Sequence, residues 1–96
     1  MKKVAIYGSS SMAGHILNEY FSLKDNYIVD CIEENKIFDK NFILRKDMVF
    51  SDSDYIINCI RCLVEESESD PTKAIVYNSY LPNLLYDHYN NSQTKI

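Results

Sequence analysis

The stretch that decides the fold is KKVAIYGSSSMAG, which spans residues 2–14. Its first part, Lys2–Tyr7, is a short apolar run that ends at Gly8, which is typical of a buried strand. Apolar residues at helical spacing follow the serines, and they predict a helix from about Ser11 to Lys24. The apolar stripe of this helix consists of Ala13, Ile16, Leu17, Tyr20 and Phe21. The stretch therefore predicts a strand, a tight turn and a helix.

A second strand follows this helix directly. Asp25 and Asn26 are typical turn residues, and the next stretch, Tyr27–Ile32, has the composition of a strand. A strand, a helix and a strand joined by such short turns form a β–α–β unit. Its two strands are expected to be parallel, with a right-handed crossover.

Further strands are expected later in the chain. Phe42–Leu44 is a candidate for a short one, and Asp54–Ile60 is a stronger candidate because its apolar residues favour β structure. Thr94–Ile96 could begin another. These elements predict an α/β fold with a parallel sheet of about three to four strands, in a single domain that spans residues 1–96.

A long helix is predicted between the last two of these candidates. Asp70 suits a helix cap and Pro71 suits the first helical position, so we expect a helix from Pro71 to about Tyr89. Pro82 lies inside it and should kink it. The predicted inner face consists of Ala74, Asn78, Leu81, Leu85 and His88.

The composition excludes some classes of protein. The chain carries ten Lys and Arg against fourteen Asp and Glu and has no basic cluster, so we expect no nucleic-acid partner. No run of eighteen apolar residues is present, so we expect no membrane span. The three cysteines are an odd number in a sequence without an export signal, which predicts reduced thiols in the cytoplasm.

The strongest functional signal is the loop between Gly8 and Gly14. A glycine at the end of a strand permits a tight turn, and a glycine in the first helical turn lets the helix pack closely on the strand. The amide groups at the helix start then attract a phosphate. The alternative is a plain tight turn, because Ser11 stands where a third glycine would best admit a pyrophosphate.

Two acidic residues stand about twenty residues further on, at the end of the second predicted strand. A carboxylate at Glu33 or Glu34 can accept hydrogen bonds from the ribose hydroxyls of NAD and would repel the 2′-phosphate of NADP. The alternative is that both are solvated loop charges. This pattern slightly favours NAD over NADP.

Two segments of the chain resemble a known family. DYIINCI at residues 54–60, and the pattern Asp-Pro-x-x-Ala-x-x-x-Asn-Ser-x-x-Pro-x-Leu-Leu at residues 70–85, resemble the extended short-chain dehydrogenase/reductase superfamily. The chain is most similar to its dTDP-4-dehydrorhamnose reductase and sugar-nucleotide epimerase branch. The loop from Gly8 to Gly14 is similar to the Gly-x-x-Gly-x-x-Gly loop of that branch, with Ser11 in place of the middle glycine.

The resemblance implies a Rossmann-type domain, incomplete at its carboxyl end, that binds NAD or NADP. The glycine-loop residues that it assigns to the cofactor are Gly8, Ser10, Ser11, Met12 and Gly14. Asn58, Cys59 and Ile60 would pass beside the cofactor, and Asn78 would help to order the active site. From the residues alone, Asn78 is equally well a core asparagine bonded to neighbouring backbone.

The family's catalytic residues lie beyond this chain, so we assign no catalytic residue. The expected function is that of the cofactor-binding portion of a sugar-nucleotide reductase or epimerase that is inactive alone. The alternative is a non-catalytic remnant or binding module without dinucleotide affinity. Because the strand at 54–60 would have an unpaired edge, we expect a separate C-terminal half or a second copy of the chain as partner.

Three other motifs carry weaker signals. Tyr20 and Lys24 match the family's Tyr-x-x-x-Lys pair, but we reject them because Tyr20 is expected in the buried stripe. Cys59 and Cys62 form a C-x-x-C pair, for which redox or zinc chemistry is less favoured than a plain strand cysteine, and no metal site is assigned. Arg61 either reaches an anionic ligand or is an exposed loop charge.

Overall fold

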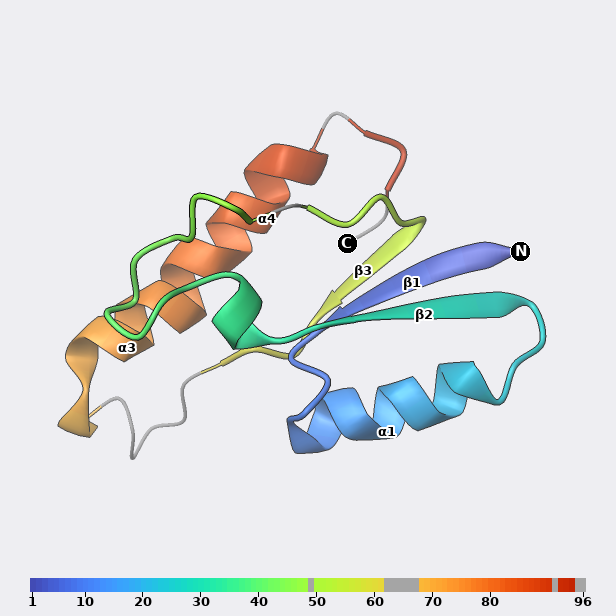
Figure 1. The fold of residues 1–96 in the computed structure, drawn as a ribbon, viewed down its shortest axis with the longest axis horizontal. Helices are drawn as coiled ribbons and strands as arrows, with labels where there is room; N and C mark the ends of the chain where they lie inside the picture. The colour runs from blue at the N-terminus through green and yellow to red at the C-terminus, as the bar shows by residue number, and fades with distance from the viewer. Residues whose placement is uncertain (49, 62–67, 91, 95–96) are drawn as a thin grey trace.

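The computed structural model describes residues 1–48, 50–61, 68–90 and 92–94. A sheet of three strands lies between helices on its two faces, α1 on one face and the α3–α4 helix on the other (Figure 1). The fold class is therefore α/β with a parallel sheet, in agreement with the prediction. Within the described residues, no helix is long and apolar enough to cross a membrane.

The first strand lies in the centre of the sheet. β1 (Lys2–Tyr7) pairs in parallel with β2 (Tyr27–Ile32) on one side and with β3 (Tyr55–Asn58) on the other, which gives the strand order β2-β1-β3. β1 and β2 have the predicted bounds. β3 is shorter than the predicted Asp54–Ile60, because the Asn58 side-chain oxygen accepts a hydrogen bond from the Ile60 amide at 3.1 Å and turns the chain.

One helix covers the first face of the sheet. α1 (Met12–Ser22) contacts β1 and β2 through its buried Gly14 and the half-buried Leu17 and Phe21. The predicted stripe is wrong for Ala13, which is exposed, and for Ile16 and Tyr20, which are 59% and 54% exposed. No second helix of the described chain flanks α1 on this face, so only a narrow arc of its surface meets the sheet.

The opposite face is covered by one continuous helical rod with the predicted bounds. It consists of α3 (Pro71–Ile75), the π-helical turn η2 (Val76–Tyr80) and α4 (Leu81–Tyr89). Asp70 caps it by accepting a hydrogen bond from the Lys73 amide at 3.1 Å. A π turn, in which the Leu81 amide bonds to the Val76 carbonyl five residues back, directly precedes Pro82, where the sequence predicted a kink.

The π turn also changes which residues face the sheet. A π turn takes more residues than an α turn, so the buried face is shifted relative to a regular helix. The buried members are Tyr77, Leu81, Leu85 and Tyr89. The predicted inner positions of Asn78 and His88 are wrong, because both side chains are exposed.

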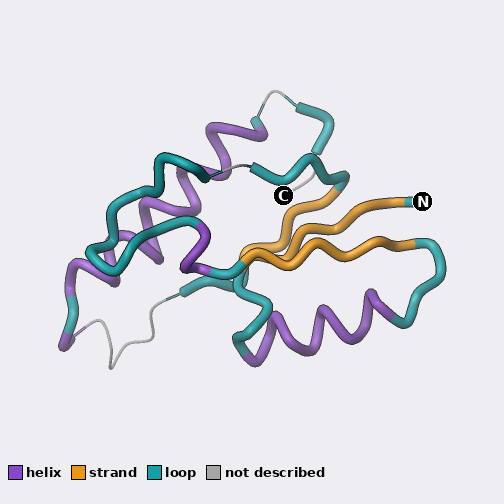
Figure 2. Tube along the Cα trace, viewed as in Figure 1, coloured by secondary structure: helices purple, strands orange, loops and turns teal. Residues whose placement is uncertain are grey.

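The segment between β2 and β3 is a long loop with one short helix, η1 (Glu34–Lys36) (Figure 2). The strand considered at Phe42–Leu44 is absent from the sheet. Leu44 instead forms an isolated antiparallel bridge with Phe38. The Phe38 ring is buried and stacks at 6.0 Å on Tyr77, so this loop contributes apolar residues to the core rather than a strand.

After α4 the chain returns to the start of β3. The Thr94 hydroxyl donates a hydrogen bond to the Ser53 carbonyl at 2.6 Å. The strand considered at Thr94–Ile96 lies largely outside the described residues. The outer edge of β3 has no strand partner in the described part of the chain.

Leu81 provides a test of this core. Its side chain is fully buried under the sheet, so Leu81→Ala should lower the free energy of unfolding by about 2–5 kcal/mol through lost burial and the cavity left behind. Leu23→Ala is the matched control, because Leu23 is 84% exposed, and should change it by less than about 0.5 kcal/mol. Urea unfolding measures both. Equal effects at the two positions would contradict the packing of α4.

Candidate functional site

A cavity of about 470 Å³ opens where the glycine loop meets the carboxyl end of β3. It is lined from the loop by Gly8, Ser10, Ser11 and Met12, and from the segment after β3 by Cys59, Ile60 and Arg61. Glu34 and Lys73 complete its rim. Two segments that are about fifty residues apart in sequence meet here because the carboxyl ends of parallel neighbouring strands lie at the same edge of a sheet.

Both loop glycines are required by the backbone. Gly8 has a φ of +84°, which side chains disfavour. A Cβ at Gly14 would overlap the Gly8 carbonyl oxygen and lie 2.8 Å from the Ser9 Cα. The helix therefore approaches the end of β1 more closely than any side chain at position 14 would allow.

Ser11 is used inside the loop. Its hydroxyl donates to the Gly8 carbonyl at 2.8 Å and accepts from the Gly14 amide at 3.1 Å, which makes it the cap of α1. The Ser11 amide also bonds to the Gly8 carbonyl, at 3.1 Å. Of the first-turn amides, those of Met12 and Ala13 have no acceptor within an α-helix and are the ones left for an external anion.

Two cationic side chains border the same cavity. Arg61 is exposed just after β3, and Lys73 extends from the first turn of α3, with its ammonium 5.5 Å from the centre of the Tyr77 ring. From the sequence, Arg61 was either a contact to an anion or an exposed loop charge, and Lys73 was not identified as a site residue. A cation in the first turn of a helix is unfavourable because it opposes the helix dipole. This unfavourable position could have indicated Lys73 as a candidate site residue from the sequence.

Glu33 lies directly after β2, as predicted, and its carboxylate is held by the glycine loop. The Ser9 hydroxyl donates to Oε1, and the Ser10 hydroxyl donates to Oε2 at 2.6 Å. Burial raises the pKa of Glu33, but the hydrogen bonds from Ser10 and Ser9 outweigh this effect and hold it below its ordinary value. The sequence reasoning missed this contact, although Gly8 and Glu33 follow neighbouring parallel strands. Glu34 is exposed at the cavity rim.

The segment after β3 supplies one wall. Cys59 is half-buried, and its amide donates to the Tyr7 carbonyl at 2.7 Å. Burial raises the pKa of the Cys59 thiol, and the charge of Arg61 offsets only part of that effect, so the reactive thiolate is disfavoured. Cys62, the other half of the C-x-x-C pair, lies outside the described residues. Among the described residues, no group of three or more His, Cys, Asp and Glu side chains is arranged to hold a metal.

Two sequence motifs lie away from this cavity. Asn78 is on the exposed side of η2 and does not line it. Tyr20 and Lys24 are neighbours, with the Lys24 ammonium 4.9 Å from the Tyr20 ring centre, but they lie at the other end of α1 from the glycine loop (Figure 1). The reason for rejecting this pair is therefore its position, since Tyr20 is exposed.

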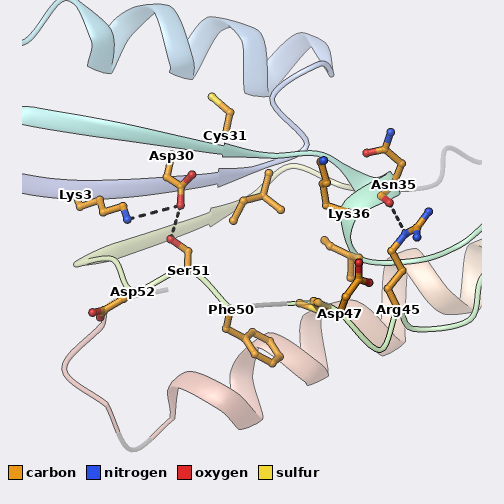
Figure 3. Close-up of a pocket in the computed structure, with 13 residues that line it drawn as sticks. Lys3, Asp30, Cys31, Asn35, Lys36, Arg45, Asp47, Phe50, Ser51 and Asp52 are labelled. Atoms are coloured by element: carbon orange, nitrogen blue, oxygen red, sulfur yellow. Dashed lines mark hydrogen bonds and ion pairs between the residues drawn. The ribbon is translucent and has the colours of Figure 1, made fainter.

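A larger cavity of about 720 Å³ lies beside η1 under the long loop (Figure 3). Three of the charged residues that line it, Lys3, Asp30 and Arg45, have partners within it. Lys3 forms an ion pair with Asp30 at 3.8 Å, the Ser51 hydroxyl donates to Asp30 at 2.7 Å, and Arg45 Nε donates to the Asn35 carbonyl at 2.6 Å. Because opposite charges are mixed here, this cavity suits an anion less well than the smaller one does.

The chain matches no family model, no curated protein and no solved structure. The case for its function accordingly comes from the residues and their geometry.

The contact of Glu33 with the loop can be tested by pH. Ser9→Ala/Ser10→Ala should lower the free energy of unfolding at neutral pH by on the order of 1 kcal/mol, a charge-assisted effect reduced by exposure to solvent. The pKa of Glu33 is lowered in the folded chain, so this stabilisation is complete above the ordinary value of 4.5 and is lost as the pH falls through the folded pKa.

Urea unfolding of wild type and variant, at neutral pH and in acid well below that value, gives the two differences. Ser22→Ala removes an exposed hydroxyl that bonds to Asn18 and is the matched control. A difference as large in acid as at neutral pH would contradict the assignment to Glu33.

Proposed function

We propose that this chain binds a dinucleotide, with NAD favoured over NADP, as the Rossmann-type cofactor portion of a sugar-nucleotide reductase or epimerase. The branch of the extended short-chain dehydrogenase/reductase superfamily that it resembles is the one that contains dTDP-4-dehydrorhamnose reductase. A cytoplasmic location belongs to this proposal, because the three cysteines suit a reducing compartment. The observation that carries it is the convergence of the glycine loop, the start of α1 and two cationic residues on one cavity.

The cavity has the chemistry that a pyrophosphate requires. The start of α1 at Met12, with the positive end of the helix dipole, attracts an anion from one side. Arg61 and Lys73 add positive charge from the other side. Guanidinium and ammonium groups are the usual side-chain partners of phosphate. A pyrophosphate in the cavity would contact the start of the helix on one side and the two cations on the other.

Glu33 is the residue expected to contact the ribose. A carboxylate after the second strand of a β–α–β unit is suited to accept hydrogen bonds from the two ribose hydroxyls of NAD. The lowered pKa of Glu33 keeps it ionised at neutral pH. A 2′-phosphate beside that charge would be repelled, which supports the preference for NAD.

The main alternative is a binding module that has lost dinucleotide affinity. The observation in its favour is that the loop already uses its own polar groups. Ser11 bonds to Gly8 and Gly14, and Glu33 accepts from both Ser9 and Ser10. A direct binding measurement separates the two functions.

In this proposal a partner supplies the catalytic groups, because no catalytic residue is assigned in this chain. A separate C-terminal half or a second copy is the partner that we propose. The outer edge of β3 is where an added strand would extend the sheet, because unpaired backbone groups on an edge strand bind other strands.

The binding test is fluorescence titration with NADH and NADPH. We expect weak binding of both, with NADH tighter. Gly14→Ala should abolish it, because the added Cβ meets the Gly8 carbonyl and separates the helix from the strand. His15→Val is an exposed control on the same helix and should leave binding unchanged. Circular dichroism checks that each variant is folded. Undiminished NADH binding by a folded Gly14→Ala variant would disprove the assignment of the loop.

The purified chain alone should not reduce a sugar nucleotide. No residue has been assigned as the general acid, and such a group typically contributes about 10²- to 10⁴-fold to the rate. NADH oxidation in the presence of dTDP-4-dehydro sugars is the measurement. Turnover that disappears in Tyr20→Phe would contradict this prediction and assign catalysis to the Tyr20–Lys24 pair.

A further inference from the structure

We propose that Ser9 and Ser10 are positioning residues that fix the Glu33 carboxylate and thereby set the preference for NAD over NADP. This inference rests on the proposed function. It concerns the serine hydroxyls, which lie in the glycine loop but act through a residue on the neighbouring strand.

The two hydrogen bonds divide evenly over the carboxylate. Ser9 donates to one oxygen and Ser10 to the other, so the plane of the carboxylate is fixed by two contacts from one side. An ionised carboxylate offers about four acceptor positions. The Ser9 and Ser10 backbones also hydrogen-bond to the carboxylate, so the loop fixes its orientation through several of these positions.

The loop that holds the serines is itself rigid. Gly8 donates its amide to the Ile32 carbonyl at 2.7 Å, which ties the loop to the end of β2 immediately before Glu33. Ser11 caps α1 on the other side of the two serines. Ser9 and Ser10 are thus held between two fixed points. Their hydrogen bonds restrict the Glu33 side chain, which otherwise has three free torsions.

The charge of Glu33 is not neutralised by a neighbour. Among the described residues, its hydrogen-bond partners are the hydroxyls and backbones of Ser9 and Ser10, which are all neutral, and it forms no ion pair. A 2′-phosphate brought to the same place would meet a full negative charge. Fixing the carboxylate there strengthens the discrimination, because a mobile carboxylate could turn away from the phosphate.

The experiment compares the dissociation constants of NADH and NADPH for four proteins in the full chain. These are wild type, Glu33→Gln, Ser9→Ala/Ser10→Ala, and the triple variant that combines them. In Ser9→Ala/Ser10→Ala, we expect NADH affinity to fall by about threefold to tenfold while NADPH affinity is unchanged or rises, so the preference narrows. In the Glu33→Gln background, the serine substitutions should add no further change. Ser22→Ala is the control and should leave both constants unchanged.

The possible results distinguish a failure of the proposed function from a failure of the positioning role of the serines. If folded wild type binds neither nucleotide, the proposed function fails, and this inference fails with it. If wild type prefers NADH and the double serine variant keeps the same preference, the positioning role alone is wrong. Serine substitutions that weaken both nucleotides equally, or that act equally in the Glu33→Gln background, would instead assign the hydroxyls to direct ligand contact. Tighter NADH binding by Ser9→Ala/Ser10→Ala would mean that the serines compete with the ribose.

Discussion

At Gly14 the first helix passes so close to the end of β1 that the Gly8 carbonyl occupies the space of a side chain. This approach forces Gly8 into a positive φ and brings Ser11 into position to cap the helix. It also turns the serines of the loop toward the end of β2, where Ser9 and Ser10 reach Glu33. This one contact sets the positions of the amides at the start of α1, of the Glu33 carboxylate and of the loop wall of the cavity.

The opposite face of the sheet is held by a buried polar cluster as well as by apolar packing. The Tyr89 hydroxyl on α4 donates to the Ser51 carbonyl at 2.6 Å and lies 3.4 Å from the Tyr7 hydroxyl on β1. Burial, together with the contact from Tyr7, raises the pKa of Tyr89, so the phenol stays protonated. Because a buried hydroxyl without a partner is costly, this cluster fixes α4 and the segment before β3 in one register. The position of Arg61 beyond β3 depends on that register.

The cavity combines opposite requirements within a short distance. Arg61 and Lys73 favour an anion, whereas Glu34 on the β2 side of the rim opposes one. A ligand with a charged middle and a neutral hydroxylated group at one end fits this division, because the phosphates meet the cations and the hydroxyls meet the acid.

The sequence by itself determined β1, β2, the start of α1 and the extent of the Pro71–Tyr89 helix, because caps, turn residues and periodicity act between near neighbours. It also indicated the glycine loop and Glu33. Only the tertiary structure decided that Tyr77 rather than Asn78 faces the core, since the π turn changes the register of the residues that precede Leu81 and Leu85, which are buried as predicted. The tertiary structure likewise decided that Glu33 bonds to the serines and that Lys73 borders the same cavity as the loop. Each depends on which strands are neighbours, and pairing of segments far apart in sequence leaves no local periodicity to read.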